Sequence, residues 1–184
     1  LAKFRRLFEQ REHKYTLYSA GEQLFGLPSQ TYPELEQTRR ELELLDRLYS
    51  LYTRVIGTIA EYNETPWADV AVQMSEMKAK AAEFQAACAK MPKELRAWDA
   101  YIELKKTVDD FLESLPLVEQ LANPSLRPRH WKALEELTGA SLNIQSETFK
   151  LATLLEAGIL QRYEDVEEIA GSAVKELAIE GKLN

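Results

Sequence analysis

The side chains that most often do chemistry in proteins are sparse in this sequence. It has two histidines, His13 and His130, and a single cysteine, Cys88. A di-iron centre in a helical bundle takes Glu-x-x-His pairs, but Gln10 and Arg127 stand three residues before the histidines. A histidine-assisted nucleophile would need a loop signature that the sequence does not have. We therefore expect no catalytic residue and no metal site.

Nucleotide binding is not indicated either. A phosphate-binding loop needs closely spaced glycines so that backbone N–H groups reach the phosphate oxygens. The seven glycines nowhere fall within four residues of one another. Gly181-Lys182 imitates the end of such a loop, but no glycine lies five residues before Gly181 and no Ser or Thr follows Lys182. We expect no cofactor in this segment.

Composition narrows the possible partners. Lys and Arg number 23 against 30 Asp and Glu, which gives a net charge of −7 and argues against a nucleic-acid-binding protein, since that needs a clustered basic face. No apolar run approaches the roughly 20 residues of a membrane span. Paired carboxylates such as Asp109-Asp110 are interpreted as solvated helix faces. Cys88 cannot form an internal disulfide, and it is expected to be a small buried apolar residue of a cytosolic protein.

Four residues stand out as structural anchors, meaning side chains that fix helix junctions. Trp98 and Trp131, like Trp67, each fall near the start of an expected helix in apolar phase. Arg129 and His130 belong to the one basic, aromatic cluster of an acidic chain. A buried Trp131 with an arginine paired to a nearby carboxylate is the favoured interpretation, and an exposed partner-binding knob is the alternative.

Apolar spacing of three and four residues predicts an all-α fold, an elongated bundle of about seven or eight helices. Thr31 is the expected N-cap of a long helix to Asn63, with Glu34 completing a capping box, and Thr65 is the expected N-cap of the next. Pro116 is expected to break the chain. The helices are expected near residues 1–25, 31–63, 65–90, 92–112, 129–137, 146–157 and 166–177. Gly26-Leu27-Pro28 is expected to stop the first of them, and Gly139 to close the fifth.

The expected inner faces follow the same spacing. They comprise Leu1, Phe4, Phe8, Tyr15, Tyr18 and Phe25 in the first helix; Val70, Met74, Met77, Ala81 and Phe84 in the third; Leu95, Trp98, Ile102, Val108 and Leu112 in the fourth; and Val166, Ile169, Ala173, Val174 and Leu177 in the last. Residues 1–184 are expected to form a single segment with a possible sub-boundary near 113–128. Leu1 falls in mid-pattern, so the chain is expected to be cut from something longer.

Several short blocks point to a family when they are taken together. They are Leu24-Phe25-Gly26-Leu27-Pro28, Tyr32-Pro33-Glu34-Leu35, Trp98 followed by residues 104–111, Arg129-His130-Trp131, residues 146–151 and residues 173–176. Their order and spacing resemble the region before and into the linker of dynein heavy chains, and most of all the gamma-type heavy chains of the axonemal outer arm. The likeness spans nearly the whole chain.

This resemblance implies a non-catalytic, force-transmitting tail or linker segment of an ATP-driven microtubule motor in ciliary or flagellar axonemes. ATP and Mg²⁺ would bind in the parent's AAA+ ring, and the microtubule would be reached only through distant parts. The implied partners are the rest of the heavy chain, including that ring, and other dynein subunits, with no nucleic acid and no membrane. An independent helical adaptor of spectrin-like bundle type is the alternative from another class.

Overall fold

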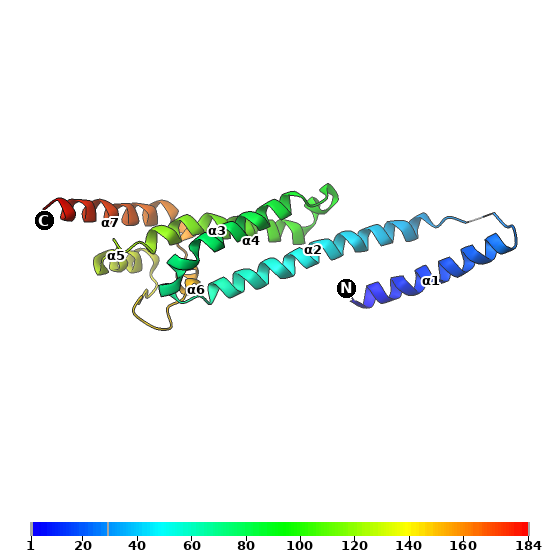
Figure 1. The fold of residues 1–184 in the computed structure, drawn as a ribbon, viewed down its shortest axis with the longest axis horizontal. Helices are drawn as coiled ribbons and strands as arrows, with labels where there is room; N and C mark the ends of the chain where they lie inside the picture. Colours follow the sequence, from blue (N-terminus) through cyan, green and yellow to red (C-terminus); the bar gives the residue numbers. More distant parts are fainter. Residues whose placement is uncertain (1, 29, 184) are drawn as a thin grey trace. The chain divides into compact units, whose positions relative to one another are not determined.

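The computed structural model describes residues 2–28 and 30–183, and within them the chain is all-α, which confirms the predicted fold class. Seven α-helices and two short 3-10 helices follow one another along it (Figure 1). None of the described helices combines the length and apolarity needed to cross a membrane. The elements are α1 (Ala2–Leu24), α2 (Pro33–Asn63), α3 (Trp67–Ala89), η1 (Lys93–Ala97), α4 (Asp99–Leu121), α5 (Pro128–Thr138), α6 (Leu151–Glu156), η2 (Leu160–Arg162) and α7 (Tyr163–Leu183).

The chain divides into two compact units, Leu1–Ser50 and Leu51–Asn184, and the division falls inside α2. The two units are defined by which parts of the backbone contact one another. They do not test whether residues 1–184 act as a single segment with a sub-boundary near 113–128, so that expectation stays a prediction.

The first unit is a helical hairpin made of α1 and the first half of α2. Arg5 of α1 pairs with Asp46 of α2, and Glu12 pairs with Arg39. The partners therefore run in opposite directions along the sequence, which makes the two helices antiparallel. Between them Gly26 takes a φ of 65°, a left-handed conformation that glycine adopts without strain, so the predicted stop after α1 is confirmed.

The second unit is built on α3 and α4, which lie side by side in Figure 1 and pack together more extensively than any other pair of elements. The inner face predicted for α3 is confirmed, because Val70, Met74, Met77, Ala81 and Phe84 are all buried. Cys88 is also buried, as expected. Tyr101 of α4 donates its hydroxyl hydrogen bond to the Cys88 carbonyl at 3.0 Å, which satisfies a backbone acceptor at the end of α3.

Two predicted helix starts are wrong by one residue. The α2 helix begins at Pro33, and the Tyr32 carbonyl accepts the first hydrogen bond from the Leu35 N–H at 3.0 Å. The α3 helix begins at Trp67, with Pro66 as its N-cap. At α2 the proline takes the first helical position, which suits its fixed φ. At α3 Thr65 pairs instead with a distant segment, so the helix starts later.

The prediction that Pro116 breaks the chain is wrong, because α4 continues through it to Leu121. Pro116 is exposed, whereas Leu115 and Leu117 beside it are buried. Burial of the flanking leucines outweighs the lost backbone hydrogen bond. The inner face predicted for α4 is right at Val108 but wrong at Ile102, which is 54% exposed.

The error at Ile102 has a local cause. The 3-10 helix η1 precedes α4, and a 3-10 turn holds fewer residues than an α turn. Counting helical steps of three and four residues from Leu95 therefore does not identify the buried face of α4. The residues that α4 buries are Tyr101, Leu104, Val108, Phe111, Ser114, Leu115, Leu117, Val118 and Leu121.

Other predicted stripes are only partly correct. Phe8 of α1 is buried, but Tyr18 and Phe25 are exposed, while Leu1 and the side chain of Phe4 lie outside the described residues. In α7 Val174 and Leu177 are exposed. The helix predicted from Ser146 begins only at Leu151. Helices expected at 129–137 and 166–177 are present as α5 and α7.

Three aromatic rings join segments that are far apart in the sequence. The Trp67 and Trp131 ring centroids lie 5.6 Å apart and those of Trp67 and Phe149 lie 5.7 Å apart, with all three rings edge to face. The backbone closes the same corner, since the Trp67 N–H donates to the Phe149 carbonyl at 3.1 Å and the Leu151 N–H to the Thr65 carbonyl at 3.0 Å. This arrangement, called here the aromatic corner, fixes α5 against the start of α3.

Replacing Trp131 by alanine should destabilise the chain. The indole is only 6% exposed and contacts both other rings, so we expect a loss of about 3–5 kcal/mol in the free energy of unfolding. Urea denaturation followed by circular dichroism would measure it. Val72→Ala is the matched control, since Val72 is 84% exposed on α3 and should cost no more than about 0.5 kcal/mol. An equally small loss for Trp131→Ala would refute the anchor role.

Pro116→Ala should stabilise the chain. A proline inside a helix costs about 3 kcal/mol, and part of that is offset because proline also restricts the unfolded chain. We expect a gain of about 1–3 kcal/mol in the same denaturation experiment. Pro124→Ala, in the turn after α4, should give no gain. A destabilised Pro116→Ala variant would show that the proline is required for the packing of α4.

Candidate functional site

A cluster of polar residues around the start of α5 is the best-defined polar site of the second unit. Arg127 is the N-cap of α5, in an extended conformation, and Pro128 occupies the first helical position. The Arg127 N–H donates to Nδ1 of His130 at 3.0 Å, and the His130 N–H donates to the Arg127 carbonyl at 2.9 Å. The imidazole therefore takes the place of the acidic or amide side chain that usually closes a helix N-terminus.

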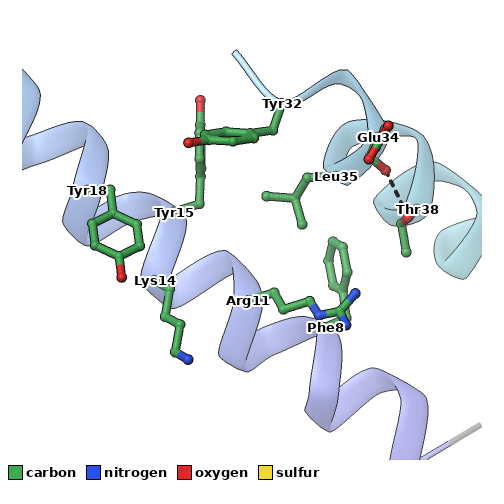
Figure 2. Close-up of a pocket in the computed structure, with 9 residues that line it drawn as sticks. All are labelled: Phe8, Arg11, Lys14, Tyr15, Tyr18, Tyr32, Glu34, Leu35 and Thr38. Atoms are coloured by element: carbon green, nitrogen blue, oxygen red, sulfur yellow. Dashed lines mark hydrogen bonds between the residues drawn. The ribbon is translucent and has the colours of Figure 1, made fainter. Parts of the chain in front are cut away.

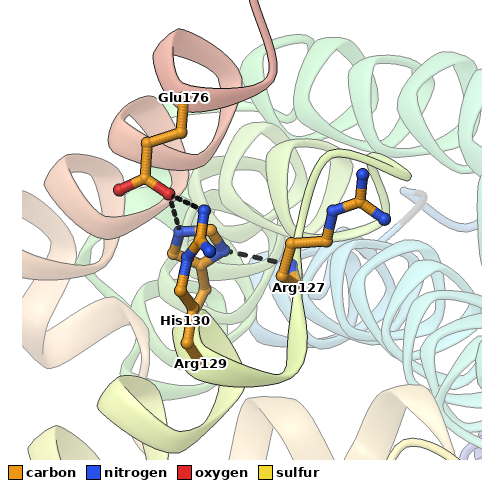
Figure 3. Close-up of polar contacts among 4 residues, drawn as sticks. All are labelled: Arg127, Arg129, His130 and Glu176. Atoms are coloured by element: carbon orange, nitrogen blue, oxygen red, sulfur yellow. Dashed lines mark hydrogen bonds and ion pairs between the residues drawn. The ribbon is translucent and has the colours of Figure 1, made fainter. Parts of the chain in front are cut away.

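The other ring nitrogen of His130 reaches across to α7. Its Nε2 lies 3.1 Å from Oε2 of Glu176, and the same carboxylate oxygen pairs with the Arg129 guanidinium (Figure 3). The His130 side chain is only 8% exposed, whereas those of Arg129 and Glu176 are 57% and 43% exposed. We call this set, Arg129, His130 and Glu176, the α5–α7 clasp.

The hydrogen bonds assign the state of the imidazole. Nδ1 accepts from a backbone N–H, so a neutral ring has its proton on Nε2, which then donates to Glu176. The hydrogen bond from Arg129 lowers the pKa of the Glu176 carboxyl below its usual value, partial desolvation opposes the shift, and the hydrogen bond from His130 adds to it. Glu176 is thus held as the carboxylate that both donors require.

This geometry suits a structural role better than a chemical one. Both ring nitrogens of His130 already have partners, so a metal or a proton acceptor could reach the ring only by opening the α5 N-terminus or the contact with α7. Within the described part of the chain, no three His, Cys, Asp or Glu side chains are grouped as they would be to hold a metal ion. The clasp can orient two helices and neutralise charge between them.

The structure brings three of the four expected anchors together. Arg129, His130 and Trp131 are consecutive in α5, with Trp131 in the aromatic corner and the other two in the clasp. Trp98 lies apart, half-buried at the N-cap of α4. Sequence analysis did not find Glu176, which lies 46 residues beyond His130, because nothing in the local pattern distinguishes it from other helical glutamates.

Comparison of the sequence with known proteins finds one matching family and a set of relatives. Residues 35–184 match the family described as "Dynein heavy chain, N-terminal region 2". The whole chain is 50% identical to "Dynein gamma chain, flagellar outer arm" of Chlamydomonas reinhardtii and covers 4% of that protein. It is 44% identical over 180 residues, 98% of the chain, to "Dynein axonemal heavy chain 8" of Mus musculus, again 4% of that relative.

A third relative is "Dynein beta chain, ciliary" of Tripneustes gratilla, 37% identical over 175 residues, which are 95% of this chain and 4% of the relative. The chain therefore spans a small part of the length of each of these proteins. The family match covers far more than half of the chain, and it includes the clasp and the aromatic corner. This chain belongs to the dynein heavy chains, as a part of their N-terminal region.

Proposed function

We propose that this chain is a non-catalytic segment that transmits force in the tail or linker region of an ATP-driven microtubule motor of cilia or flagella. The names of the relatives, "flagellar outer arm", "axonemal" and "ciliary", support a location in the axoneme. The observation that carries the mechanical role is α2, a single helix of 31 residues in which the division between the two compact units falls.

An uninterrupted helix is a physical means of passing load along a chain. To bend sharply at any point, it must give up the backbone hydrogen bonds of the turn at that point. In the second unit α2 is also packed, since Leu51 and Val55 are buried and the Tyr62 ring stacks on Phe111 with centroids 6.2 Å apart. Close-packed side chains deform little before contacts are lost, so load entering α2 reaches the core of this unit.

Catalysis is assigned to other parts of the parent protein. We propose that ATP and Mg²⁺ bind in the AAA+ ring of the heavy chain, that microtubules are bound by distant parts, and that this segment has no cofactor. Its proposed partners are the rest of the heavy chain, including the ring, and other dynein subunits. An independent adaptor of spectrin-like type is not favoured by any contact described above.

Breaking α2 at the division should uncouple force from ATP hydrolysis. Ser50→Pro removes one backbone donor and clashes with the carbonyl one turn earlier, at a local cost of about 3 kcal/mol. Ser50 is exposed, so no packed side chain is lost. In the intact motor we expect slower microtubule gliding or lower stall force, while microtubule-stimulated ATP hydrolysis largely survives. Both rates would be measured on one preparation.

Ser50→Ala is the matched control, because alanine changes the same side chain but favours the helix. It should leave gliding and ATP hydrolysis as they are in the unmodified motor. Unchanged gliding by Ser50→Pro, with the helix break verified by hydrogen exchange, would place this segment outside the path of force. Loss of gliding together with loss of the ATPase would indicate a role in assembly instead.

The chain itself should not bind ATP. No glycine-rich turn is present to direct several backbone N–H groups at the phosphates, and the clasp's Arg129 is already paired with a carboxylate. Isothermal titration of the chain with MgATP should show no saturable heat at millimolar concentrations. Saturable binding in the micromolar range would overturn the assignment of all nucleotide sites to other parts of the heavy chain.

A further inference from the structure

The first unit has a groove of about 390 Å³ between α1 and the start of α2. Its floor is apolar and is formed by Phe8, Tyr15 and Leu35 (Figure 2). The Tyr15 ring meets the Tyr32 ring edge to face with centroids 5.5 Å apart. The Tyr32 hydroxyl donates to Gln30 Oε1 at 2.9 Å. These two contacts orient the Tyr32 ring, which forms one side of the groove. A groove of this size accepts one or two large side chains.

The rim of the groove is basic on the α1 side. Arg11 and Lys14 line it together with Tyr18, which is 65% exposed. Within the described part of the chain, neither Arg11 nor Lys14 has an ion-pair partner, in contrast to Arg5 and Arg39 of the same hairpin. At this groove, therefore, two cations without a carboxylate partner among the described residues lie next to the apolar side chains of its floor.

These rim residues belong to a longer stripe along α1. Steps of four, four, three and four residues keep side chains on one helical face, and they select Lys3, Leu7, Arg11, Lys14 and Tyr18. All five are exposed, and no member is acidic. This set is called the α1 stripe.

The charge of this stretch is opposite to that of the whole chain. Residues 3–14 contain five cations, Lys3, Arg5, Arg6, Arg11 and Lys14, against two acids, Glu9 and Glu12, so their net charge is +3. The complete chain has a net charge of −7, which leaves −10 for all other residues. An acidic partner would therefore be attracted to α1 and repelled by the net negative charge of the rest of the chain.

We propose that the groove and the α1 stripe together bind an acidic amphipathic α-helix of another polypeptide, which inserts a large apolar side chain beside Phe8 and places carboxylates against Arg11 and Lys14. Apolar anchors at helical spacing and a matching groove are a recurrent mode of recognition. Burial of the anchor supplies affinity, and the two cations supply orientation and selectivity.

Two other anionic partners fit the surface less well. A bilayer is flat and takes up protruding apolar side chains, whereas Phe8 is recessed and only 8% exposed. A nucleic acid is bound through a clustered basic face, but this groove is lined by two cations, Arg11 and Lys14, and by the acidic Glu34. An amphipathic helix can match the apolar floor and both kinds of charge. It can offer a hydrogen-bond donor to Glu34 and carboxylates to Arg11 and Lys14. The proposal does not depend on the role of α2 in force transmission.

The test uses the complete chain and a fluorescein-labelled synthetic helix of about 20 residues, with leucines on one face and glutamates on the other. Fluorescence anisotropy at physiological ionic strength should show saturable binding. Arg11→Glu with Lys14→Glu should raise Kd by roughly 10-fold or more, since two favourable charge contacts become repulsive. Lys93→Glu with Lys106→Glu, two exposed lysines of the second unit, is the matched control and should leave Kd unchanged.

Two further measurements separate the contribution of charge to binding from that of apolar contact. A peptide with lysines in place of the glutamates should bind the Arg11→Glu, Lys14→Glu variant better than it binds the unmodified chain. Tyr18→Ala should weaken the acidic peptide without changing the charge. Circular dichroism verifies that α1 stays helical in each variant.

The proposal is overturned if the acidic peptide fails to bind the unmodified chain, or if the double charge reversal leaves its Kd unchanged. Tighter binding of a single-stranded oligonucleotide, or of phosphatidylserine vesicles, would assign the surface to a nucleic acid or to a membrane instead.

Discussion

The aromatic corner of Trp67, Trp131 and Phe149 is the contact on which the second unit depends. Edge-to-face pairs of this kind are worth about 0.5–1.5 kcal/mol each beyond the burial of their surface. Their greater effect is geometric, because the three rings come from α3, α5 and the segment before α6. The backbone bridge between Pro66 and Lys150 closes the same corner, so side chains and main chain impose one arrangement on segments about 80 residues apart.

The clasp extends that arrangement to α7. His130 immediately precedes Trp131 in α5, so once the indole is fixed in the corner the imidazole is directed at Glu176. The same imidazole also closes the N-terminus of α5. One side chain thus couples the start of a helix to its packing against another helix, and the arginine beside it keeps the receiving carboxylate ionised.

These contacts are suited to maintaining shape. Histidine and cysteine are scarce, and His130, the buried histidine, has both ring nitrogens engaged in holding helices. On the hairpin of the first unit, Arg11 and Lys14 of the α1 stripe have no ion-pair partner among the described residues, and both line the apolar groove. In the second unit the polar groups of the clasp serve the fold, whereas in the first unit the α1 stripe is the surface that we propose binds a partner.

The sequence by itself determined the all-α class, the face of α3 and the ends of α1 and α5. Each of these follows from local physics: helical spacing of apolar residues, and glycines at positions such as Gly26 and Gly139, where φ is positive. The blocks that resemble dynein heavy chains also lie in the sequence, so the family could be predicted from it. The burial of Trp131 followed from its phase in a short amphipathic helix.

Tertiary structure decided what local rules could not. Pro116 remains inside α4 because the leucines on either side of it are buried, and propensity alone contains no term for that burial. Thr65 leaves the N-cap of α3 because its carbonyl pairs with the N–H of Leu151, a partner that becomes close only after the chain folds. Glu176 and His130 meet for the same reason. Spacing along one helix determines which face is apolar, but only packing between helices determines which distant residue that face meets.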